Sequence, residues 1–203
     1  MIQKSVAVRD AQNDAAETAV GAAPLLKFYD GSLPADCAAS IGASNTLASG
    51  TLPSNWLGDS ASGVKALAGS WTATGQAAAG TGTLATYFRI WDAAGTTCHY
   101  QGTVKTAISL TTSALTAAHG NVLNFAATTG VAAGMTVSGT GIPTGTTVES
   151  VTGTTVTLSQ TTTAGVSSAT SITFGGDMNL DNVSIANAQV VTVTAWNETA
   201  GNA

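Results

Sequence analysis

The hydrophobic pattern of the chain is helical only near its start. Apolar side chains recur at helical spacing from Ser5 to Val20, and the predicted apolar face is made of small residues, Val8, Ala11, Ala15 and Ala19. Ser5 can cap this helix, Gly21 stands where a C-cap glycine is expected, and Pro24 prevents its continuation. Because such a face buries little area, we expect the helix to need support from the rest of the fold or from another subunit.

After Pro24 the pattern becomes that of β-strands. The most strand-like run is 84–92 (LATYFRIWD), and a short turn joins it to 97–105 (TCHYQGTVK), which predicts a hairpin. A strand is also expected at 25–30, whereas Pro53 reduces 51–57 to a strand end or an edge. The runs 178–185 and 189–197 predict a second hairpin, with apolar residues at the alternate positions Met178, Leu180, Val191, Val193 and Ala195.

Between these parts lies a Thr-rich and Gly-rich segment with short β-branched runs. The runs are 122–127, 135–139, 146–151, 154–159 and 171–174. Their spacing of about 8–12 residues is typical of an all-β sandwich or barrel. The only charged side chain from Thr106 to Gly176 is Glu149, whereas all six Lys and Arg precede Thr106. This shift in composition indicates a domain boundary.

The predicted fold is therefore mainly β. Residues 1–107 together with 174–203 form a discontinuous body, like a β-sandwich or a jelly roll, with a short N-terminal helix. Residues 108–173 form a small inserted all-β module. All four tryptophans fall in the body, at Trp56, Trp71, Trp91 and Trp196.

Composition excludes several classes of function. Charged residues make up 8% of the chain, against roughly 25% in ordinary soluble domains, and the net charge is −5. Nucleic-acid binding and a basic membrane-surface helix are therefore not expected. The pattern predicts no transmembrane segment and no signal peptide. An uncharged surface of this kind favours a protein packed within an assembly over a free monomer.

The cysteines are the first candidates for chemistry. Cys37 and Cys98 could be bonded only if the fold brings their Cα atoms within about 7 Å, and a bacterial cytoplasm would keep them reduced, so both states stay open. Cys98 and His99 suggest a metal, but zinc needs three or four ligands and His119 is the only other histidine. On a regular strand these neighbours face opposite ways, which predicts a buried Cys98 and an exposed His99.

Other motifs are weaker. Asp177, Asn179 and Asp181 have the spacing of a calcium loop, but its sixth and twelfth positions hold Asn182 and Ala188, so a strand with one wet face is the better interpretation. Residues 80–82 lack the third glycine of a phosphate-binding loop, and no serine has a partnered histidine and acid. The tryptophans could stack on sugars, although packing is the commoner fate of aromatic residues on strands. We predict no catalytic, cofactor-binding or metal residues, and no enzyme.

Three segments of the body resemble a known family. LLKFYDGSLPAD (25–36), YFRIWDAAGTTCHYQGTV (87–104) and GGDMNLDNVSIANAQVVTVTAWNETAG (175–201) are similar to small virion structural proteins of tailed bacteriophages and prophages. Residues that keep the closing pattern of that family are Asp177, Asn179, Leu180, Ile185, Val191 and Val193; Ala188 stands where relatives often have glycine. The segment 134–159 resembles a Thr/Gly-rich, Ig-like β repeat of phage surface proteins.

The resemblance implies a capsid decoration or cement protein that bridges neighbouring capsid subunits through non-covalent contacts. Its partners would be copies of itself and the major capsid or other virion proteins, with residues 1–20 as a binding arm. It would reside in the virion, after assembly in the host cytoplasm, and would need no cofactor. The alternative is a tail or neck accessory protein whose insert contacts host surface polysaccharide.

Overall fold

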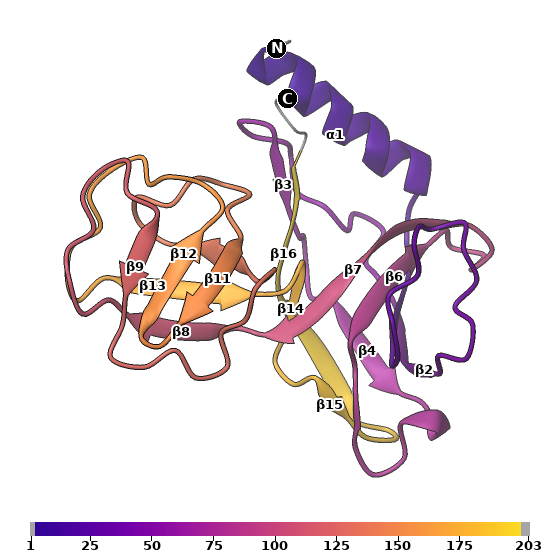
Figure 1. Cartoon of the computed structure of the whole chain (residues 1–203). Coiled ribbons are helices and arrows are strands. Elements are labelled where there is room, and N and C mark those ends of the chain that lie inside the picture. Colours follow the sequence, from indigo (N-terminus) through magenta and orange to yellow (C-terminus); the bar gives the residue numbers. More distant parts are fainter. Residues whose placement is uncertain (1–2, 200–203) are drawn as a thin grey trace. The chain divides into compact units, whose positions relative to one another are not determined.

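The computed structural model describes residues 3–199, apart from the side chains of Asn197 and Thr199. It is mainly β, with 41% strand and 9% helix, which confirms the predicted class and the N-terminal helix (Figure 1). The chain divides into two compact units, Met1–Lys105 with Met178–Ala203, and Thr106–Asp177. We call these the body and the insert.

The body is a closed seven-stranded barrel. The strands follow the order β14-β7-β6-β1-β2-β4-β16, and β16 returns to pair with β14. Their bounds are β1 Leu25–Tyr29, β2 Thr46–Thr51, β4 Thr72–Gly75, β6 Tyr87–Trp91, β7 Cys98–Thr106, β14 Met178–Leu180 and β16 Val190–Thr199. The expected sandwich or jelly roll is not confirmed, because pairing of β16 on both sides closes the sheet on itself.

Smaller elements complete the body. β3 (Val64–Ala66) pairs with the end of β16, and β5 (Thr83–Leu84) pairs with β15 (Ser184–Ile185). A short 3₁₀ helix, η1, spans Ala77–Ala79. The predicted hairpins are confirmed as the antiparallel pairs β6–β7 and β14–β16. The predicted run 178–185 is not one strand, because it contains both β14 and the separate strand β15.

Two barrel strands that the pattern did not predict are built from small residues. β2 reads TLASGT and β4 reads TATG. A Cβ atom on Gly50 of β2 would lie 2.0 Å from the carbonyl oxygen of Thr72, so the backbones approach too closely for a side chain. Gly75 is equally tight, since its Cβ would lie 1.9 Å from the carbonyl oxygen of Ala186. Close backbone contacts select these residues, and they remove the apolar alternation that identifies strands.

The core of the body is aromatic. Trp71 is fully buried, its ring centroid lies 5.2 Å from Trp196 and 5.6 Å from Trp56, and Tyr100 packs against the same cluster. The predicted alternation of β16 breaks after Val193, because Ala195 is exposed and Trp196 is buried. A β-bulge between the paired residues of β14 and β16 shifts the register and reverses the alternation.

The insert consists of two three-stranded sheets with a common core. One sheet has the order β10-β13-β8 and the other β11-β12-β9. The bounds are β8 Ile108–Thr111, β9 Val122–Asn124, β10 Thr136–Ser138, β11 Val148–Thr152, β12 Thr155–Leu158 and β13 Ser171–Gly175. Phe125 and Phe174 meet edge to face in this core, with centroids 5.5 Å apart.

Threonines fasten the loops of the insert. The hydroxyl group of Thr112 donates to the carbonyl oxygen of Ser167 at 2.7 Å, and that of Thr116 donates to Val122 at 2.8 Å. Both threonines are buried. The high threonine content therefore supplies hydrogen bonds to loop carbonyls where charged side chains are scarce.

Candidate functional site

Helix α1 (Val6–Val20) begins and ends as predicted. The Ser5 hydroxyl accepts a hydrogen bond from the backbone N–H of Val8 at 3.3 Å, and the N–H of Gly21, with φ 86°, donates to the Glu17 carbonyl oxygen. Helix α1 lies next to β3 (Figure 1). The residues that hold the helix are those that face β3 and the loop before it.

The face of α1 that packs on the body is polar. The Asp10 carboxylate accepts hydrogen bonds from the Ser60 hydroxyl at 2.8 Å and from the Gly63 backbone N–H at 2.7 Å. Asn13 is buried, and its side-chain amide donates to the same Ser60 hydroxyl at 3.2 Å. Directional bonds, rather than apolar area, hold this part of the helix.

Lys65 on β3 continues this polar contact. Its side chain is 4% exposed, its ammonium group lies 2.9 Å from the Asp14 carboxylate, and it also hydrogen-bonds with Glu17. Burial by itself would lower the pKa of Lys65, but the hydrogen bonds and charges of Glu17 and Asp14 outweigh burial and leave the pKa raised. The buried lysine is thus held in its charged form by the helix.

The predicted apolar face of α1 points outward. Val8 is 49% exposed, and all three alanines of that face are exposed. We call Val8, Ala11, Ala15 and Ala19 the outer face of α1. The polar residues take the inward position because they can bond to Ser60, Gly63 and Lys65, whereas the small apolar residues would gain little from burial. In the described part of the chain, the outer face is therefore exposed.

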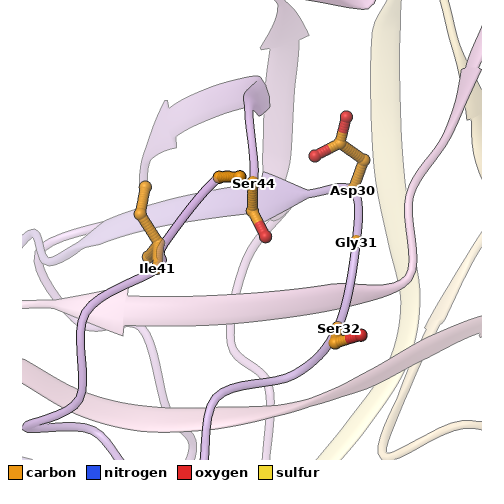
Figure 2. Close-up of a pocket in the computed structure, with 6 residues that line it drawn as sticks. Asp30, Gly31, Ser32, Ile41 and Ser44 are labelled. Carbon is orange, nitrogen blue, oxygen red and sulfur yellow. The ribbon is translucent and has the colours of Figure 1, made fainter.

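A hollow lies between the two ends of the loop that connects β1 to β2 (Figure 2). Its volume is about 460 Å³, and its lining residues are Asp30, Gly31, Ser32, Ile41, Ala43 and Ser44. Asp30 is the one titratable group among them, and its carboxylate accepts from the Asn45 backbone N–H at 2.6 Å and from the Asn45 amide at 2.9 Å. These bonds close the loop. Because Asp30 is the one titratable lining residue, the hollow offers no acid–base pair.

A second hollow contains both cysteines. It measures about 590 Å³ and is lined by residues of the 37–41 loop together with Arg89, Trp91, Thr96, Thr97 and Cys98. Arg89 is 1% exposed, and its guanidinium donates to the carbonyl oxygens of Asp36 at 3.0 Å and Ala39 at 2.9 Å. The fold therefore brings Cys37 to Cys98, with both thiols free.

The expectation of a buried Cys98 and an exposed His99 is wrong, because both side chains are partly exposed. Cys98 pairs with Trp91 and Tyr100 pairs with Ile90, so His99 is the extra residue of a β-bulge. A bulge interrupts the alternation on which the expectation rested. Among residues 3–199, no three His, Cys, Asp or Glu side chains are grouped as metal ligands would be.

The remaining candidates have structural partners. Met178 and Leu180 are buried in β14, and the Asp181 carboxylate accepts from the Thr192 backbone N–H at 2.9 Å. Three of the tryptophans are buried and present no open ring to a sugar, whereas Trp91 is partly exposed with the Lys27 ammonium 5.2 Å from its ring centroid.

Lys65 and Arg89 were missed by the sequence analysis. The signal that could have found them is a single charge inside a short strand, VKA for Lys65 and YFRIW for Arg89. Within the described residues, no helix is long and apolar enough to cross a membrane. Comparison with models of protein families, with curated proteins and with solved structures gives no match to this chain.

Proposed function

We propose that this chain is a structural component of a bacteriophage virion, a capsid decoration or cement protein that bridges neighbouring subunits without covalent bonds. The observation that carries the proposal is the orientation of α1. Its polar face is bonded to the body, and its outer face, with Val8 49% exposed, is not covered by any of the residues 3–199. A rigid helix that displays small apolar residues can approach a neighbouring surface closely.

The insert supports the same role. Its two small sheets around one core are compatible with an Ig-like module, and Glu149 is the one charged side chain from Thr106 to Gly176. A surface rich in threonine and poor in charge costs less to desolvate against a protein neighbour than a charged surface would. The resemblance of the body segments to virion structural proteins gives the partners we propose, namely copies of itself and the major capsid protein.

The outer face of α1 provides the test. The purified chain is sedimented with empty capsids of the phage or prophage that encodes it. We expect the wild type to co-sediment, and the double variant Ala11→Glu with Ala15→Glu to bind at least roughly tenfold more weakly, because two charges would be buried without partners. Ala94→Glu adds a charge at an exposed position in the turn between β6 and β7, outside α1, and should bind normally.

Two results would refute this function. One is a wild-type protein that stays monomeric at high concentration and fails to bind empty capsids. The other is equal binding by the double variant and the wild type, which would remove α1 from the contact.

The alternative of a tail or neck accessory protein predicts a different phenotype. In that case, phage that lack residues 108–173 would keep stable heads but lose adsorption to cells. Phe125 and Phe174 are the insert's aromatic residues and both are buried, so a polysaccharide would be held by hydroxyl and backbone groups rather than by stacking.

A further inference from the structure

Cys37 and Cys98 come from separate elements of the body. Cys37 lies in the loop between β1 and β2, and Cys98 is the first residue of β7. They are 61 positions apart in the sequence. The loop reaches β7 because the buried Arg89, on the intervening strand β6, donates to the carbonyl oxygens of Asp36 and Ala39 on either side of Cys37.

The two side chains meet at the second hollow. Both side chains line it, and both are partly exposed. The Cys98 thiol also lies 3.4 Å from the carbonyl oxygen of Tyr100. A small oxidant that enters the hollow can therefore reach both cysteines from one side.

We propose that Cys37 and Cys98 are a site of oxidative modification, where a low-molecular-weight disulfide of the glutathione type converts them into an intramolecular disulfide. This proposal does not depend on the proposed virion function. The bond would join the 30–45 loop to the β6–β7 hairpin across the Arg89 contact.

The reaction balances as two thiol–disulfide exchanges. In the first, the Cys37 thiolate attacks one sulfur of the oxidant and releases one small thiolate. In the second, the Cys98 thiol loses its proton and attacks the Cys37 sulfur of the mixed disulfide, which releases the second small thiol. One protein disulfide forms, two protein thiols are oxidised, and one small disulfide is reduced to two thiols.

The order of these steps follows from burial. Burial raises the pKa of Cys98 to about 12, with a further contribution from Cys37, and Arg89 only partly opposes it. Because the thiolate is the nucleophile, Cys37 is the residue that reacts first with the oxidant, and Cys98 resolves the mixed disulfide.

The experiment uses the full chain, fully reduced and then incubated with oxidised glutathione. We expect the intact mass to fall by about 2 Da, the mass of the two hydrogens lost, and a non-reducing peptide map to link Cys37 with Cys98. The melting temperature should rise by about 5–10 °C over the reduced protein, since the bond closes a long loop.

The variants Cys37→Ser and Cys98→Ser should each abolish the 2 Da change, and the double variant should show no shift in melting temperature with oxidant. If a single variant fails to fold, the mass and peptide map of the wild type still decide. A glutathione adduct that persists on either cysteine, or a disulfide between two chains, would overturn the proposal.

Discussion

The ammonium group of Lys65 on β3 lies 2.9 Å from the carboxylate of Asp14 on α1, and the same ammonium bonds to Glu17. Because Lys65 is buried, its removal leaves Glu17 facing a site that has lost its counter-charge. We expect Lys65→Met to lower the free energy of unfolding by about 1–3 kcal/mol. Urea titration measures the loss.

Lys105→Met is the matched control for this prediction, because Lys105 is exposed on β7. Its effect should stay within about 0.5 kcal/mol. Equal stability of Lys65→Met and the wild type would mean that the ion pair does not hold the helix.

Trp71 should be the most sensitive position of the barrel core. Its ring is fully buried, and its indole N–H donates to the carbonyl oxygens of Trp56 at 3.0 Å and Ala68 at 3.2 Å. Trp71→Ala should cost about 3–5 kcal/mol, through lost apolar burial and a cavity. Thermal unfolding followed by far-UV circular dichroism measures it, and Trp91→Ala, at a partly exposed ring, should cost clearly less.

Glu198 should make the body less stable as the pH rises. Burial raises the pKa of Glu198, and the hydrogen bond with Tyr100 only partly opposes this. In the unfolded chain the pKa of Glu198 is about 4.3, so the unfolded state loses this proton first as the pH rises. The free energy of unfolding therefore falls from about that pH until the pH exceeds the raised pKa of Glu198 in the folded state. Unfolding free energies between pH 4 and pH 8 should show this fall in the wild type.

Glu198→Gln should remove that part of the pH dependence, whereas Glu149→Gln, at an exposed position of the insert, should retain it. If the wild type and Glu198→Gln show the same slope, Glu198 is not the group responsible.

The barrel should fold without the insert. β7 and β14 are hydrogen-bonded neighbours in the barrel, so the two points where the chain leaves and re-enters belong to adjacent strands. We expect a chain with residues 107–177 replaced by a short Gly-Ser linker to keep the tryptophan emission of the wild type, since all four tryptophans lie in the body. Emission typical of solvated indole would show that the insert is required for folding.

Local signals in the sequence predicted the elements that depend on local chemistry. The Ser5 cap, the Gly21 C-cap and the β6–β7 hairpin are each formed by nearby residues. β2 and β4 were missed because close backbone contacts within the barrel require small residues there, and these contacts are absent from the linear pattern. The bulges near His99 and Trp196 likewise arise from pairing between distant strands.

Which face of α1 packs on the body was also not predictable from the sequence. Its apolar residues are too small to outweigh the directional bonds of its polar face, and the bonding partners, Ser60, Gly63 and Lys65, lie far along the chain. The candidate interaction surface therefore appears only when the tertiary structure shows which face is already occupied.

The two faces of α1 respond in opposite ways to dissolved salt. Mobile ions screen the attraction of the exposed Asp14 to Lys65, which weakens this part of the polar contact as ionic strength increases. Strongly hydrated anions such as sulfate strengthen the burial of apolar groups, which favours the outer face on any surface that receives it. Salt therefore acts on the two faces through different physics, by screening a charge pair on the polar face and by changing the hydration of apolar groups on the outer face.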